Sequence, residues 1–86
     1  MIRGRDILLK PKEFALLAVL AREPGRTFPA ADLYRKVWGM DMAGDGRTVK
    51  EHISRIRSKL GRKSRFTVVS ERGKGYRLQF SDTILP

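Results

Sequence analysis

Cationic side chains surround a short glycine turn near the C-terminal end of the chain. The segment SERGKGYRL, residues 70–78, places Arg72, Lys74 and Arg77 within six positions, next to Gly73 and Gly75. Glycine allows a tight reversal because it adopts backbone conformations that other residues avoid. The turn itself does not require three cations. We therefore expect the positive charges at this turn to face a polyanionic partner.

The basic residues of the chain are concentrated in one segment. The chain has 19 Lys and Arg against nine Asp and Glu, a formal net charge of +10. Residues 47–77 contain eleven of the basic residues and only two acidic ones, so this segment alone carries +9. A localised charge of this size favours binding to nucleic acid. The alternative, a solvated basic surface without a partner, would suit an evenly spread charge better.

A helix is predicted from about Thr48 to Leu60, with one apolar and one polar side. Its apolar stripe consists of Val49, Ile53, Ile56 and Leu60. At 100° per residue, the polar side consists of Arg47, Glu51, Ser54, Arg55 and Ser58. Such a helix fits the major groove of B-DNA, where Arg can pair with guanine and flanking cations can meet phosphates. A solvent-exposed helix is the alternative, but exposed helices normally mix both signs of charge.

The two ends of this helix also have sequence signals. Thr48 and Glu51 match the capping-box pattern T-x-x-E, which predicts that they close its N-terminus. Gly61 matches a C-terminal stop.

Shorter signals divide the rest of the chain. A short strand is expected around Ile7–Leu9, followed by a helix that begins at Pro11 and continues over residues 12–22. In that helix four apolar residues recur near helical spacing: Phe14, Leu16, Leu17 and Leu20. A second helix is expected between Pro29 and Gly39, with Leu33, Val37 and Trp38 on its apolar side. Residues 66–80 alternate β-forming residues around the glycine turn and predict a hairpin.

These signals predict an α+β fold in which three helices precede a two-stranded hairpin. Residues 1–86 form one domain, with a three-helix core over about 11–60, a C-terminal β-hairpin over about 66–80 and a short N-terminal strand.

Composition argues against several other classes of protein. It has no cysteine and a single histidine, His52, so no disulfide framework, His-pair metal site or cysteine-histidine nucleophile can be assembled. No paired carboxylates suggest an enzyme, and no cofactor motif is present, since GKG lacks the spacing of a phosphate-binding loop. No apolar run is long enough to cross a membrane. We expect a cytoplasmic protein that is not an enzyme and needs neither metal nor cofactor.

The motifs resemble those of a known family. The pattern KPKEFALLAVL…ADLYRKVWG…RTVKEHISRIRSKL…SERGKGYRL is similar to the winged-helix DNA-binding domain of OmpR/PhoB-type response regulators, from Leu8 to Leu78. Its most specific parts are RTV..HISRIRSKL, the tryptophan nine residues before Arg47, and the closing RGKGYR. The resemblance implies a winged helix-turn-helix fold, with the C-terminal hairpin as the wing. It also implies a transcription factor module that binds double-stranded promoter DNA, often as tandem copies on repeated half-sites.

The resemblance also implies roles for individual residues. Arg55 corresponds to the principal base-contacting arginine, with Ser54 and Glu51 beside it. Positions that approach phosphates or flank the groove are Arg47, Thr48, His52 and Arg57, and aromatic residues at the DNA backbone are Trp38 and Tyr76. Ser70, Arg72 and the neighbouring Lys74 belong to the wing, and the loop 39–46 corresponds to a segment that meets RNA polymerase.

The sequence departs from the family pattern in two ways. Lys50 stands where Asp is typical, and Glu51 stands where a small apolar residue is common. We expect Glu51 to cap its helix, and the alternative is that its carboxylate accepts a hydrogen bond from cytosine N4. Most of the family's N-terminal sheet and the phosphorylatable receiver domain have no counterpart in these 86 residues.

Two other functions remain open at this point. One is a basic RNA-binding or ribosome-associated module, although neither exposed aromatics on a sheet nor a KH-type loop is predicted. The other is a domain that binds acidic proteins or anionic lipid, although no long cationic amphipathic helix supports the lipid version.

Overall fold

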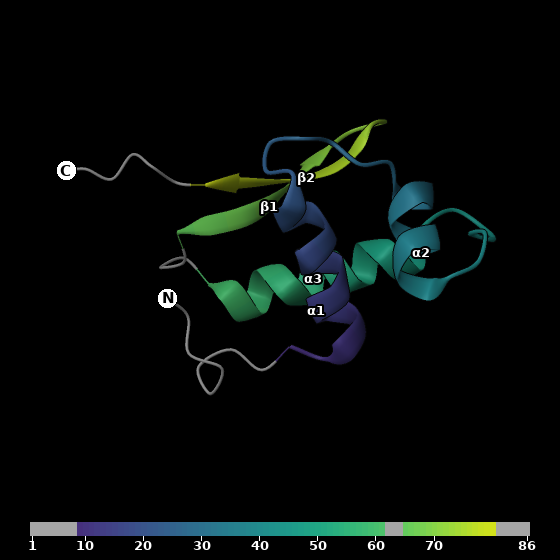
Figure 1. The fold of residues 1–86 in the computed structure, drawn as a ribbon, viewed down its shortest axis with the longest axis horizontal. Helices are drawn as coiled ribbons and strands as arrows, with labels where there is room; N and C mark the ends of the chain where they lie inside the picture. Colours follow the sequence, from purple (N-terminus) through teal and green to yellow (C-terminus); the bar gives the residue numbers. More distant parts are fainter. Residues whose placement is uncertain (1–8, 62–64, 81–86) are drawn as a thin grey trace.

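The computed structural model describes residues 9–61 and 65–80. Three helices precede a two-stranded antiparallel hairpin: α1 (Pro11–Arg22), α2 (Ala30–Trp38), α3 (Arg47–Leu60), β1 (Phe66–Glu71) and β2 (Gly75–Phe80) (Figure 1). The predicted winged-helix fold is confirmed. The short strand expected around Ile7–Leu9 lies mostly outside the described residues, and Leu9 itself is not in a strand.

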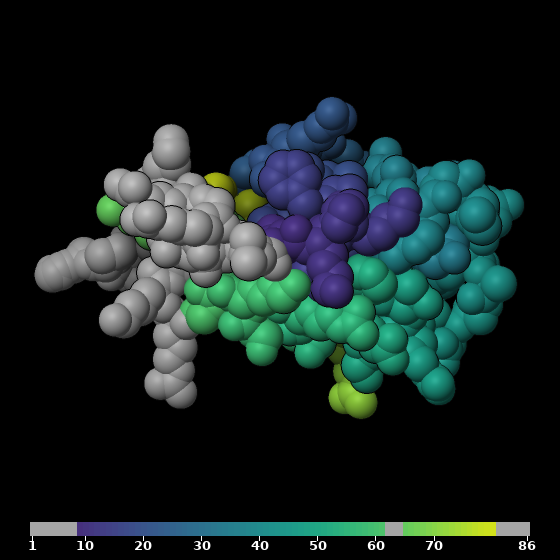
Figure 2. Space-filling view, turned by 90° about the horizontal axis from the view of Figure 1, so that it is seen from below, coloured from purple at the N-terminus to yellow at the C-terminus, as the bar shows by residue number. Residues whose placement is uncertain are grey.

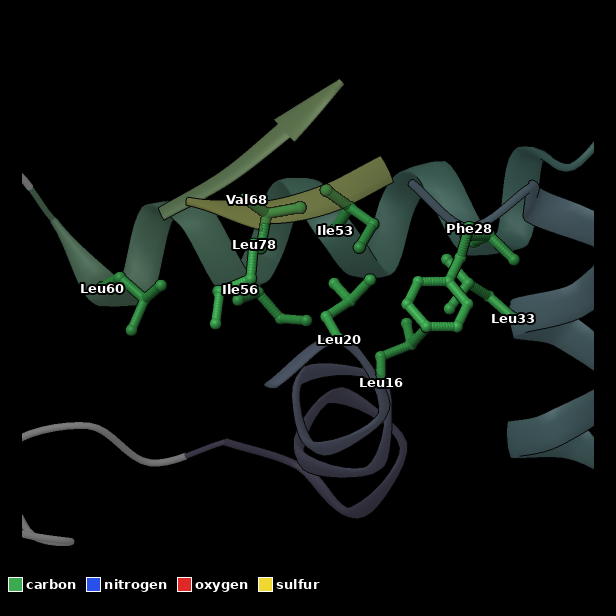
Figure 3. Close-up of a cluster of buried hydrophobic side chains, with 10 residues drawn as sticks. Leu16, Leu20, Phe28, Leu33, Ile53, Ile56, Leu60, Val68 and Leu78 are labelled. Carbon is green, nitrogen blue, oxygen red and sulfur yellow. The ribbon is translucent and has the colours of Figure 1, made fainter. Parts of the chain in front are cut away.

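The helices pack through a small apolar core (Figure 3). Leu16 and Leu20 of α1 meet Leu33 of α2 and the apolar stripe of α3, and Val68 and Leu78 cover them from the hairpin. All four residues of the predicted stripe, Val49, Ile53, Ile56 and Leu60, are buried. This stripe therefore fixes which side of α3 remains exposed.

Two of the apolar residues of α1 take a different position from Leu16 and Leu20. Leu17 is only partly buried, and Phe14 is 63% exposed. Phe14 lies about 160° around the helix from Leu16, on the side away from the core. Glu13 is fully buried among the core residues instead.

The predicted capping box at the start of α3 is wrong. Gly46 is the N-cap, in the left-handed conformation with φ of 83°, so the N-cap residue itself has no side chain that could cap the helix. Arg47 is already the first helical residue, so Thr48 and Glu51 lie two positions beyond the places that a capping box would occupy. Asp45, which precedes the N-cap, satisfies one of the free N–H groups instead: its Oδ1 accepts a hydrogen bond from the Arg47 N–H at 3.2 Å.

The hairpin is attached to the segment between α1 and α2. The pairing runs in register from Phe66 opposite Phe80 to Glu71 opposite Gly75. A bridge that the sequence did not predict joins Phe28 to Tyr76, with N–H···O distances of 2.8 and 3.0 Å. Gly25 also donates its N–H to the Leu78 carbonyl oxygen at 2.9 Å. The hairpin is therefore held along its β2 edge.

Candidate nucleic-acid interface

The polar side of α3 faces solvent. Arg47, Glu51, Ser54, Arg55 and Ser58 are all exposed, on the side of α3 opposite its buried stripe. Figure 2 shows the tip of the hairpin projecting beyond α3, on the side of the molecule away from α1. The helix face and the hairpin tip can therefore approach one extended partner together.

An open groove separates α3 from the hairpin. It has a volume of about 740 Å³, and Lys50, Ser54 and Arg57 line it from α3. Ser70, the tip residues 71–75 and Tyr76 line it from the other side. The groove thus lies between α3 and the glycine turn, two parts of the segment 47–77 in which the sequence concentrates positive charge.

Several cations near this groove are exposed to solvent. The described residues offer neither a hydrogen bond nor an ion pair to the side chains of Lys50, Arg55, Arg72 and Lys74, all of which are exposed. Unpaired cations at this density repel one another, and an anionic ligand would relieve that repulsion. These four cations are the main candidates for contact with an anionic ligand.

Arg77, the third cation of the glycine turn, is used within the protein. Its Nε donates to Glu71 Oε2 at 3.1 Å, and its Nη1 donates to Gln79 Oε1 at 2.8 Å. The hydroxyl of Thr27 donates to Glu71 Oε1 at 2.6 Å. The Thr27 hydrogen bond, followed by that from Arg77, lowers the pKa of Glu71, which therefore stays ionised. Arg72 and Lys74 are thus the two turn cations left for a ligand.

Arg57 connects α3 to the hairpin. Its Nε donates to the Val68 carbonyl oxygen at 2.8 Å, and its Nη2 donates to Ser70 Oγ. This side chain lines the groove, but two of its nitrogen atoms already have protein acceptors.

Trp38 and His52 form an aromatic cluster on the other flank of α3. Trp38 stacks on Tyr34 with a centroid distance of 4.7 Å, and the His52 ring meets it edge-on at 5.0 Å. Lys12 Nζ of α1 lies 5.8 Å from the centroid of the Trp38 ring. His52 Nδ1 lies 2.8 Å from the Thr48 carbonyl oxygen. Trp38 and His52 are partly buried, so they can offer only their outer edges to a ligand.

The structure thus places the predicted residues in two groups on either side of the exposed face. The groove side holds Ser54, Arg57, Ser70, Arg72, Lys74 and Tyr76. The α1 side holds Trp38, Thr48 and His52, and between the two lie Arg47, Glu51 and Arg55.

A buried ion pair fixes α3 against α1, and sequence reasoning missed it. Glu13 is fully buried, and its Oε1 accepts from Lys59 Nζ at 2.7 Å and from the Lys10 N–H at 3.0 Å. Burial acts to raise the pKa of Glu13, but Lys59 and the Lys10 N–H together bring it below its ordinary value. The helical spacing of Glu13 with Leu16 and Leu20 was the available signal.

Comparison with known proteins decides the family. The sequence model of the family described as "Transcriptional regulatory protein, C terminal" matches residues 4–78. The chain belongs to this family. The resemblance to OmpR/PhoB-type domains is confirmed, and the family is one of transcription regulators, not of enzymes.

Individual relatives agree with this assignment. The chain is 45% identical over 78 residues to the heme response regulator HssR of Staphylococcus epidermidis, covering 90% of this chain and 35% of the relative. The chain thus spans about a third of the length of the curated relatives it matches.

Solved structures show the same fold. The DNA-binding domain of Bacillus subtilis CssR has a TM-score of 0.73 and 35% identity, over 84% of this chain and 78% of that one. The Klebsiella pneumoniae RstA DNA-binding domain, solved in complex with the RstA box, has a TM-score of 0.73 and 28% identity, over 85% and 74% of the two chains.

Proposed function

We propose that this chain binds double-stranded promoter DNA sequence-specifically, as the effector domain of an OmpR/PhoB-type response regulator. In this proposal α3 enters the major groove and the wing, defined as the hairpin Phe66–Phe80, lies at the adjacent minor groove. The observation that carries it is the shared orientation of the exposed face of α3 and the wing tip, together with their unpaired cations. An RNA-binding or ribosome-associated role is not favoured by the family assignment.

Each part of the interface receives a distinct role. Arg55 projects from the middle of the exposed face and contacts a base edge, with Ser54 and Glu51 beside it. Glu51 does not cap the helix, so its carboxylate is available to cytosine N4. The residues that contact phosphates or flank the groove are Arg47, Thr48, His52, Arg57, Trp38 and Tyr76. At the wing, Ser70 and Lys74 meet phosphates, and Arg72 enters the minor groove.

The proposal includes further partners. Two copies of the chain bind tandem half-sites about one helical turn apart, and like charges keep the copies apart in the absence of DNA. The loop 39–46 meets RNA polymerase, and its Met40 is 58% exposed. In this proposal the protein acts in the cytoplasm, where it meets promoter DNA and RNA polymerase.

Selection from a random pool of DNA duplexes tests this function. We expect the chain to enrich a defined motif, and the enriched duplex to compete with a structured RNA of equal length at least about a thousandfold better. Enrichment of no motif, or equal competition by the RNA, would overturn the proposal.

A further inference from the structure

The hairpin meets α3 through hydrogen bonds as well as through the apolar core. The hydrogen bonds that the described residues show between α3 and the hairpin all come from Arg57, to the Val68 carbonyl oxygen and to Ser70 Oγ. The segment between α1 and α2 also holds the hairpin: Gly25 and Phe28 bind β2, and the Thr27 hydroxyl donates to Glu71 at the end of β1. Between α3 and β1, Arg57 is the polar connection among the described residues.

The chemistry of this contact requires arginine. The two acceptors are two residues apart along β1, and the guanidinium meets them with two different nitrogen atoms, Nε and Nη2. A planar guanidinium fixes both distance and direction, whereas the ammonium of lysine is a single point on a flexible stem. The Arg57 contact therefore defines a distance and an orientation between α3 and the wing, which a simple charge attraction would not do.

We infer that Arg57 is a positioning residue that holds the wing where Arg72 and Arg55 can engage one duplex at the same time. This inference rests on the proposed function and assigns Arg57 a part in it other than phosphate contact. Arg72 lies two residues beyond Ser70, so a change in how β1 is held moves the tip directly. The contribution of Arg72 to binding should then depend on Arg57.

A double-mutant cycle tests this dependence on the duplex that the wild-type chain enriches. In the wild-type background, Arg72→Ala should lower affinity about tenfold. In the Arg57→Lys background, which keeps the charge, the same change should lower affinity less than about threefold. Ser70→Ala removes one of the two acceptors of Arg57. In this background too, Arg72→Ala should lower affinity less than it does in the wild-type chain.

Lys50→Ala is the matched control. Lys50 lines the same groove and carries the same charge, but it has no hydrogen bond to the hairpin. Its loss should weaken binding while the tenfold effect of Arg72→Ala stays unchanged. An Arg72 effect of equal size in the wild-type, Arg57→Lys and Ser70→Ala backgrounds would mean that Arg57 is a phosphate contact only, and the inference would be overturned.

A measurement without DNA separates this inference from the proposed function. Residual dipolar couplings report the orientation of each amide bond. In the wild-type chain, the couplings of Val68–Arg77 should agree with the alignment tensor determined from α3, and in Arg57→Lys they should agree with it poorly. A cooperative thermal unfolding transition shows that the variant is folded. If the couplings of the variant fit equally well, Arg57 does not position the wing, whether or not the chain binds DNA. If no duplex is bound but the couplings change, the proposed function fails and the positioning role remains.

Discussion

Gly75 is the residue at which the fold leaves no space for a side chain. Its φ is 139°, and a Cβ atom built on it would lie 2.0 Å from the Phe28 carbonyl oxygen. That carbonyl accepts from the Tyr76 N–H in the bridge that attaches the hairpin. Gly73 has φ of 76° but nothing within 4 Å of a built Cβ atom. Gly73 is therefore needed for its backbone conformation alone, whereas Gly75 is also needed because Phe28 leaves no space for a side chain.

The substitution Gly75→Ala should destabilise the protein by at least about 2 kcal/mol, because it combines backbone strain with loss of the Phe28 bridge. The matched variant Gly73→Ala should cost only about 1 kcal/mol, from the left-handed backbone alone. Urea unfolding of both variants measures the difference. Equal destabilisation by the two would show that the approach of Phe28 is unimportant.

Glu13 gives the stability of the protein a pH dependence. Its folded-state pKa is lowered from the ordinary value of 4.5, so its contribution is fully present above pH 4.5 and is lost as the pH falls through the lower, folded-state value. The helical pattern could have shown that this carboxylate faces the core. It could not show the partner, because Lys59 lies 46 residues away and only the packing of α1 on α3 brings the two together.

Replacing Glu13 with Gln should reduce stability at pH 7 by about 1–3 kcal/mol, since it leaves Lys59 without its anion in a partly buried site. Below pH 4.5 the stability of the variant should decrease less steeply than that of the wild-type chain. Chemical denaturation at several pH values measures both effects. In the control Glu23→Gln, an exposed pair with Arg26 is removed, and stability should change by less than about 0.5 kcal/mol. A Glu13 variant as stable as this control would refute the structural role of the buried pair.

The helices and the hairpin could be predicted because each has local signals at its ends. Pro11 and Pro29 precede or open helices, and Gly39 and Gly61 end them, as expected. The capping box failed because T-x-x-E also occurs inside a helix, and only the backbone shows that Gly46 is the cap. The Phe28 bridge and the Arg57 contact could not be predicted, because both join segments that meet only after the core forms.

The wing should contribute to affinity through groove shape and phosphate contact. Substituting Arg72→Ala should weaken binding to the enriched duplex about tenfold, with any lost sequence preference confined to the A·T content of the flank beneath the wing. The measurement compares the enriched duplex with one whose flank is replaced by G·C pairs. Unchanged affinity for both duplexes would mean that the charges at the turn are simply solvated.

The charge of the whole molecule predicts a steep dependence of binding on salt. Nearly all of the net charge, +9 of +10, lies in the segment that contains α3 and the wing. If about six phosphates are neutralised, log K should fall against log salt with a slope of about −5. Titrations at four or more salt concentrations measure the slope. A slope near zero would exclude nucleic acid as the partner.

The central claim is that the exposed face of α3 selects the DNA sequence, and Arg55→Ala tests it most directly. Arg55 has no partner within the described protein, so its loss removes a contact to DNA without breaking one in the fold. Affinities of wild type, Arg55→Ala and the control Lys50→Ala are measured at one salt concentration, for the enriched duplex and for a random one. We predict that Arg55→Ala loses about 1–3 kcal/mol on the enriched duplex and much less on the random one, while Lys50→Ala weakens both equally. Equal weakening of both duplexes by Arg55→Ala would contradict the account, because α3 would then attract DNA without distinguishing its sequence.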